Sequence, residues 1–182
     1  MNSTTTSSAP RKLITLAHCF DYPDSALAQS LNLELSELEH NHIRLFINSR
    51  GGVKAPPYAG CYLDDQDRRR FMIDFNGLCL KHGIELDDSQ PPDHIPAMLE
   101  VLALLLSDPC GTSRQKSEDK TDPEGGKRVT DPEIQHLLDT FYRHWPNSFS
   151  KALARHDESG FYAATAAEME KSLNTLRCAE VS

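Results

Sequence analysis

The sequence predicts an all-α protein, a helical bundle of about six to eight helices with a flexible loop before the C-terminal helices. Apolar residues recur every three or four positions along nearly the whole chain, which is the spacing of one face of an α-helix. No alternation of apolar and polar residues is long enough for a sheet, and residues 84–86 are too few. Prolines and glycines stand at the ends of the helical segments, as expected for helix boundaries.

Two helical segments are expected before residue 52. The first ends at Tyr22-Pro23, because proline cannot continue a helix. The second ends in the glycine-containing stretch 48–52. Their apolar faces consist of residues at helical spacing: Leu13, Leu16, Ala17 and Phe20 in the first, and Leu31, Leu35, Leu38, His42, Leu45 and Phe46 in the second.

Two further helices are expected between residues 64 and 109. The third begins at Asp64 or Asp65, either of which can cap it, and ends near Gly83. The fourth begins at Asp93, whose side chain can serve as its N-cap, and ends before Pro109. Their apolar faces are Phe71, Phe75, Leu78 and His82 in the third, and Ile95, Met98, Leu99, Leu102, Leu105 and Leu106 in the fourth.

Residues 108–131 are polar or small apart from Val129, and we expect a flexible loop or hinge there. Thr130 and Glu133 then fit a capping box for the next helix. A short helix opening at Pro146 and a last helix capped by Ser159 follow. The apolar residues of these three helices are Ile134, Leu137, Leu138, Phe141, Trp145, Phe149, Ala152, Leu153, Phe161, Tyr162, Met169, Leu173 and Leu176.

The chain therefore divides into four segments. Residues 1–10 are rich in serine and threonine and are expected to be a disordered tail. Residues 11–107 form an N-terminal helical part, 108–131 a hinge, and 132–178 a C-terminal helical part. We expect the two helical parts to form one globular unit.

The composition excludes several classes of function. The net charge is −8, so the surface repels nucleic acid and anionic membranes. No apolar run approaches the roughly 20 residues of a membrane span, and the N-terminus has no apolar core of a secretory signal. The five cysteines are scattered without a C-x-x-C pair, which favours neither disulfides nor a zinc site. The cytoplasm is the expected compartment.

Two proline-led motifs carry the unusual chemistry of the chain, APPYAGCYLD at residues 55–64 and QPPDHI at residues 90–95. Asp93 and His94 suggest a small hydrolase or metal-dependent enzyme as one hypothesis. Adjacent residues on a helix point about 100° apart, however, so they cannot pair as in a catalytic triad. Cys79 and His82 share a helix face, but two ligands do not make a metal site. No glycine-rich phosphate loop is present, and no cofactor is expected.

A peptide-binding groove is the other hypothesis. Tyr58 and Tyr62 are four residues apart among prolines that fix the backbone, and Leu45 and Phe46 lie shortly before them. Carboxylates would border such an apolar groove, namely Asp64, Asp65 and Asp93. An apolar groove with an acidic rim suits an apolar peptide that carries arginine or lysine. The alternative, that both tyrosines pack in the core of a scaffold without a groove, stays open.

These residues resemble the TorD/DmsD/NarJ family of redox-enzyme maturation chaperones. The resemblance covers roughly residues 11–176. It rests on Leu45-Phe46, the two proline-led motifs, Leu137-Leu138, Trp145, Phe149 and Phe161-Tyr162.

The resemblance implies an all-α cytoplasmic chaperone without catalytic turnover or cofactor. Its partner would be the molybdopterin-containing catalytic subunit of a redox enzyme. The chaperone would bind the twin-arginine signal peptide or N-terminus of that subunit, assist cofactor insertion and delay export. A monomer or a domain-swapped dimer is compatible with the long hinge. The implied peptide-binding residues are Leu45, Phe46, Pro57, Tyr58, Tyr62, Asp93 and His94.

Overall fold

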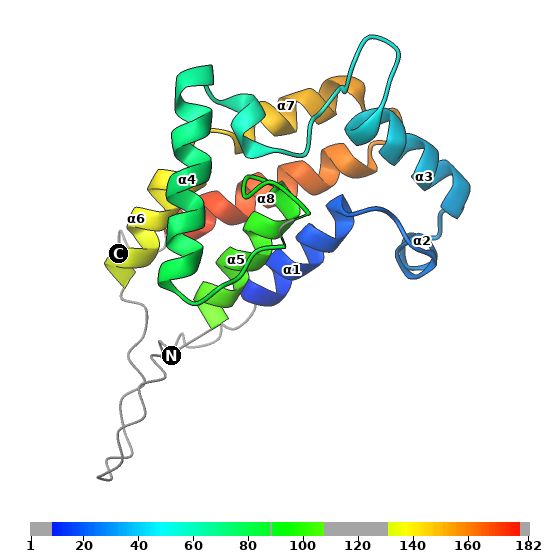
Figure 1. Cartoon of the computed structure of the whole chain (residues 1–182). Coiled ribbons are helices and arrows are strands. Elements are labelled where there is room, and N and C mark those ends of the chain that lie inside the picture. Colours follow the sequence, from blue (N-terminus) through cyan, green and yellow to red (C-terminus); the bar gives the residue numbers. More distant parts are fainter. Residues whose placement is uncertain (1–8, 88, 108–130, 179–182) are drawn as a thin grey trace, which may run out of the picture.

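The computed structural model describes residues 9–87, 89–107 and 131–178, and within these residues the protein is all-α, as the sequence predicts (Figure 1). A π-helical turn η1 (Ile43–Ile47) and a 3-10 turn η2 (Ala59–Tyr62) accompany the α-helices. The α-helices are α1 (Ala9–Phe20), α2 (Ser25–Leu31), α3 (Leu35–His42), α4 (Asp65–Lys81), α5 (Ile95–Ser107), α6 (Asp131–Phe141), α7 (Pro146–His156) and α8 (Phe161–Cys178).

Two helix boundaries before residue 52 differ from the sequence prediction. Helix α1 starts at Ala9, inside the segment assigned to the tail. The predicted second helix is interrupted because Asn32 adopts a left-handed conformation (φ 53°), which asparagine tolerates better than most residues. The Leu33 N–H then donates to the Ala28 carbonyl and closes α2. The expected hinge 108–131 and the capping residue Thr130 lie outside the described residues, except that Asp131 begins α6.

Helix α5 lies at the centre of the core. It is apolar on most of its surface, and α1 packs along it. The C-terminal part of the chain reaches the same core, where the buried Tyr142 hydroxyl donates to the Met98 carbonyl at 2.6 Å. The buried Trp145 indole donates to the Phe141 carbonyl at 2.8 Å. Helices on both sides of residues 108–130 therefore share one hydrophobic core.

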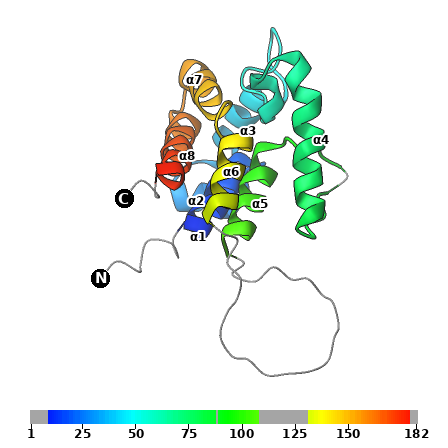
Figure 2. The same cartoon turned by 90° about the vertical axis from the view of Figure 1, so that its left-hand side faces the viewer.

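Helix α4 stands at the edge of the bundle, beside α5 and α6 (Figure 2). Its buried face is narrow and contains Phe75 and Cys79, with Phe71 half-buried next to them. The rings of Phe71 and Phe75 lie 5.5 and 5.3 Å from the ring of Phe141 on α6. Cavities beside these rings are lined by residues of both α4 and α6.

None of the described helices combines the length and the apolar character that a membrane crossing demands.

Candidate functional site

The two proline-led motifs lie side by side, although twenty-five residues separate them in the sequence. The Ala59 N–H donates to the Asp93 carbonyl at 2.8 Å, and the Ile95 N–H donates to the Pro57 carbonyl at 2.9 Å. Tyr58 and His94 thereby form an isolated antiparallel bridge. The sequence identified both motifs, and the structure brings them together through the backbone.

The Asp93 side chain is fully buried and holds the two motifs together. Its Oδ2 accepts the Gly60 N–H at 3.1 Å and lies 3.8 Å from Nε of Arg68 on α4. The expectation that Asp93 caps the following helix is therefore wrong, because its carboxylate is directed to Gly60 of the other motif. Helix α5 begins later, at Ile95.

The ion pair between Asp93 and Arg68 is incomplete. Within the part of the chain that the structure describes, neither Asp93 Oδ1 nor Arg68 Nε has a hydrogen-bond partner. Burying polar atoms without partners costs free energy. The Asp93 carboxylate and the Arg68 side chain can lie this close to the first motif because Gly60 has no side chain.

Tyr58, Tyr62 and His94 are half-buried at the edge of this junction. The rings of Tyr58 and His94 lie 5.5 Å apart. The Tyr62 hydroxyl donates to the Pro56 carbonyl at 2.9 Å, and its ring lies 5.6 Å from that of Phe149. Burial raises the pKa of Tyr62 and lowers the pKa of His94 to about 4, so both side chains are neutral near pH 7.

The other predicted site residues lie beneath the surface. Leu45 and Phe46 belong to the core, where the ring of Phe46 is 5.0 Å from the ring of Tyr162. The Leu45 carbonyl accepts the Ala55 N–H at 2.9 Å, which anchors the first motif. Pro57 is buried as well. These buried residues therefore lie below the half-buried side chains of Tyr58, Tyr62 and His94.

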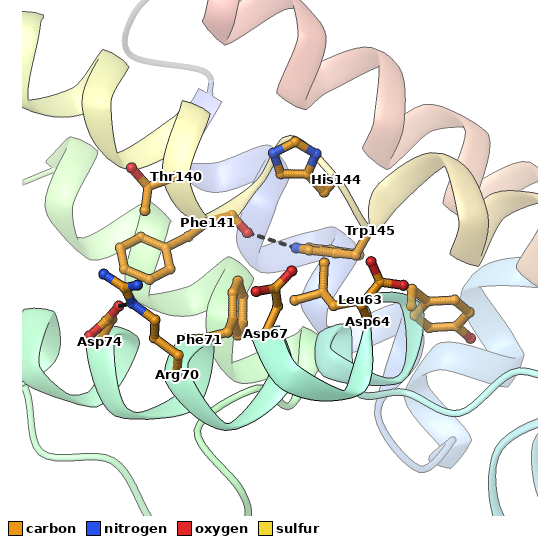
Figure 3. Close-up of a pocket in the computed structure, with 11 residues that line it drawn as sticks. Leu63, Asp64, Asp67, Arg70, Phe71, Asp74, Thr140, Phe141, His144 and Trp145 are labelled. Carbon is orange, nitrogen blue, oxygen red and sulfur yellow. Dashed lines mark hydrogen bonds and ion pairs between the residues drawn. The ribbon is translucent and has the colours of Figure 1, made fainter.

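An acidic cleft of about 540 Å³ opens next to the first motif, between α4 and the end of α6 (Figure 3). Its floor is apolar and aromatic and includes Phe71, Phe141 and the buried Trp145. Carboxylates and other side chains complete the cleft: Tyr62, Leu63, Asp64, Asp67, Arg70, Asp74, Thr140 and His144.

Three carboxylates give the acidic cleft its charge. Asp74 is 3.4 Å from Nε of Arg70, one turn away on the same helix. Among the described residues, Asp64 and Asp67 have no ion-pair partner, and both are exposed. Asp65, predicted to border the groove, does not line this cleft. The cleft can therefore bind a cation in front of an aromatic floor.

Sequence reasoning found Asp64 but missed most of this cleft. The signal was present in the spacing of Asp64, Asp67, Phe71 and Asp74, which places one carboxylate or ring per turn on a single face of α4. Phe71 was assigned to the apolar face alone. The opposite wall comes from α6 and the residues after it, more than sixty positions later.

A second groove of about 410 Å³ lies beside His94 on the other side of the junction. Asp21 and Glu100 line it, and burial raises the pKa of both carboxyl groups. The described residues contain no group of three or more histidine, cysteine, aspartate or glutamate side chains placed to hold a metal ion.

Stability is expected to fall as the pH falls from about 6.5 to about 4, partly because of His94. Its pKa is about 4 in the folded protein and near 6.5 in the unfolded chain, so the unfolded chain binds more protons in this window. Each such histidine contributes at most about 1.4 kcal/mol per pH unit. Urea unfolding should give a smaller difference in the free energy of unfolding between pH 7 and pH 5 for His94→Asn than for the parent protein.

His42 provides the comparison for this measurement. Burial also lowers its pKa to about 4, and its Nδ1 lies 3.4 Å from the Tyr162 hydroxyl. The pH dependence of the free energy of unfolding that remains in His94→Asn should therefore decrease further in the double variant His94→Asn/His42→Asn. An unchanged slope in both variants would contradict the assignment of neutral, buried imidazoles.

The model of the family described as nitrate reductase delta subunit matches residues 15–150. No curated protein matches the sequence. The fold is similar to the crystal structure of a candidate redox enzyme maturation protein from Archaeoglobus fulgidus, with a TM-score of 0.58 and 23% sequence identity over 96% of each chain.

Proposed function

Because the chain belongs to the nitrate reductase delta subunit family, we propose that it is a maturation chaperone for a redox enzyme. This membership confirms the resemblance to the TorD/DmsD/NarJ chaperones seen in the sequence. We further propose that the chaperone acts in the cytoplasm on a molybdopterin-containing catalytic subunit. It binds the twin-arginine signal peptide or N-terminus of that subunit, assists cofactor insertion and delays export.

The acidic cleft is the observation that carries this proposal. Arginine forms paired hydrogen bonds with carboxylates, and Asp64 and Asp67 are exposed and one helical turn apart. The half-buried ring of Phe71 lines the cleft, where it offers apolar contact and cation–π attraction to a guanidinium group. Two adjacent arginines therefore match both the charge and the lining of the cleft.

The seven peptide-binding residues that the resemblance implies divide into two roles in this proposal. Tyr58, Tyr62 and His94 are half-buried and contact the peptide, Tyr62 at the acidic cleft and the other two at the motif junction beside it. The buried residues hold that edge in place, namely Leu45, Phe46, Pro57 and Asp93. No observation favours the hydrolase hypothesis, because Asp93 is fully buried and paired with Gly60 and Arg68.

Removing the two free carboxylates of the cleft should weaken peptide binding. In the variant Asp64→Asn/Asp67→Asn, we expect the Kd of a twin-arginine peptide to rise at least about tenfold, since each lost charge-assisted hydrogen bond is worth about 1.5–3 kcal/mol. Isothermal titration calorimetry measures the change. A peptide with both arginines replaced by alanine should bind the parent protein and this variant equally weakly.

Asp65→Asn is the matched control. Asp65 lies in the same first turn of α4 and carries the same charge, but it does not line the acidic cleft. It interacts with the helix dipole as Asp67 does, so both substitutions have similar costs to stability. Equal losses of affinity in Asp65→Asn and Asp67→Asn would show that net charge alone governs binding, and the cleft assignment would then be rejected.

A further inference from the structure

Arg70 is the one arginine or lysine among the described residues that line the acidic cleft. It lies three residues after Asp67 and four residues before Asp74, and both of these carboxylates line the cleft with it. Residues three and four positions apart are neighbours on a helix surface, so the guanidinium group of Arg70 can reach either carboxylate. The cleft therefore contains an arginine of its own that can compete with the arginines of a bound peptide.

The structure places the guanidinium group of Arg70 at Asp74. Its Nε lies 3.4 Å from Asp74 Oδ2, and Asp67 takes part in no ion pair within the described residues. Figure 3 shows Arg70 and Asp74 together at one end of the drawn cleft, with the carboxylate of Asp67 apart from them. The carboxylate of Asp67 is thereby left available to a ligand.

The position of Arg70 decides which carboxylates of the cleft remain free. In the observed arrangement they are Asp64 and Asp67, which are nearly one helical turn apart. Asp64 directly precedes α4, but its side chain makes no capping hydrogen bond and can serve a ligand. If Arg70 turned to Asp67 instead, the remaining carboxylates would be at positions 64 and 74, about 15 Å apart along the helix axis. A compact pair of free carboxylates therefore requires Arg70 to lie at Asp74.

We propose that Asp74 is a positioning residue, which holds Arg70 away from Asp67 and so gives the acidic cleft its selectivity for two adjacent arginines. This inference rests on the proposed function and adds a determinant of selectivity to it. Asp74 acts through Arg70 and does not itself contact the peptide. The side chains of Arg70 and Asp74 are 84% and 51% exposed, so their pair is weak and shifts the position of Arg70 by only about twofold.

Two labelled serine–glycine peptides test this role on the full chain, one with two adjacent arginines and one with the second arginine replaced by alanine. We expect the parent protein to bind the first peptide at least about fivefold more tightly, because arginine forms charge-assisted hydrogen bonds with carboxylates. In Asp74→Asn, Arg70 is free to pair with Asp67, so this preference should fall by about half through weaker binding of the first peptide. Fluorescence polarisation at low ionic strength, where exposed charges are least screened, measures both Kd values.

The same substitution in the Arg70→Gln background separates positioning from direct contact. Without the guanidinium group of Arg70, no side chain of α4 competes for Asp67, so Asp74→Asn should leave the peptide preference of that background unchanged. An equal loss of preference in both backgrounds would mean that Asp74 contacts the peptide or acts through its charge alone. That result would overturn the proposal.

Two further variants control for the charge and the geometry of the pair. Asp74→Glu keeps a carboxylate within reach of Arg70 and should retain the parental preference. Asp65→Asn removes the same charge from α4 outside the acidic cleft and should retain it as well. A loss in either variant as large as that in Asp74→Asn would contradict the positioning role.

Failure of this inference is distinguishable from failure of the proposed function. If the parent protein does not prefer the peptide with two arginines, the proposed function is rejected together with the role of Asp74. If the parent protein has this preference and Asp74→Asn keeps it in full, only the role of Asp74 is rejected.

Discussion

Gly60→Ala is expected to destabilise the protein by about 1–3 kcal/mol, the usual cost of forcing an added group into a packed site. A Cβ at this position would lie 2.6 Å from Asp93 Oδ2 and 2.6 Å from Arg68 Cγ. The arginine side chain can move, but the carboxylate is buried and is fixed by the pairing of the two motifs. In a chain of this size, the loss corresponds to a decrease in Tm of roughly 2–4 °C per kcal/mol.

Gly77→Ala is the matched control for Gly60→Ala and should have the opposite sign. Gly77 lies in the exposed part of α4, and an added Cβ there contacts nothing within 4 Å. Alanine favours a helix over glycine by about 0.5–1 kcal/mol, so this variant should be slightly more stable than the parent. If both variants changed Tm equally, the close approach at Gly60 would not be a determinant of stability.

Asp93→Ala is expected to lower the free energy of unfolding by about 2–3 kcal/mol. It leaves the buried Gly60 N–H without its acceptor and Arg68 Nε without its counter-charge. We expect less than the full cost of breaking a buried ion pair, because the Arg68 side chain is 42% exposed and can turn toward water. Chemical denaturation at pH 7 measures the difference.

Asp93→Asn separates a structural role of Asp93 from direct contact with the peptide. The amide oxygen of asparagine can still accept the Gly60 N–H, so we expect a smaller loss of about 1 kcal/mol. The affinity for a twin-arginine peptide should then stay within about twofold of the parent. A large loss of affinity at near-parental stability would instead place the Asp93 carboxylate in contact with the arginines and contradict its supporting role.

The sequence predicted the elements and much of the core because helical periodicity is a local property. Phe75, Leu99 and Phe149 repeat at helical spacing with their neighbours, and all three are buried. Gly83 was expected to end α4 and adopts a positive φ of 69° just after it. The interruption at Asn32 was missed, because a single left-handed asparagine hardly disturbs an apolar pattern.

The candidate site could be predicted only in part. The two proline-led motifs were identified from unusual residues in short stretches, but their pairing depends on hydrogen bonds between residues 57–59 and 93–95. Asp93 looked like a helix cap because the sequence shows only its own neighbours. Its actual partners, Gly60 and Arg68, come from a turn and a helix earlier in the chain.

By itself, the sequence determined that this chain is an acidic all-α protein, which residues form its helix faces and which two motifs are unusual. The tertiary structure decided that Asp93 is a buried support and that α4 and α6 enclose the acidic cleft. The physical reason is one of range. Helix propensity and periodicity act over a few residues, whereas a cleft forms where faces of distant helices meet without filling the space between them.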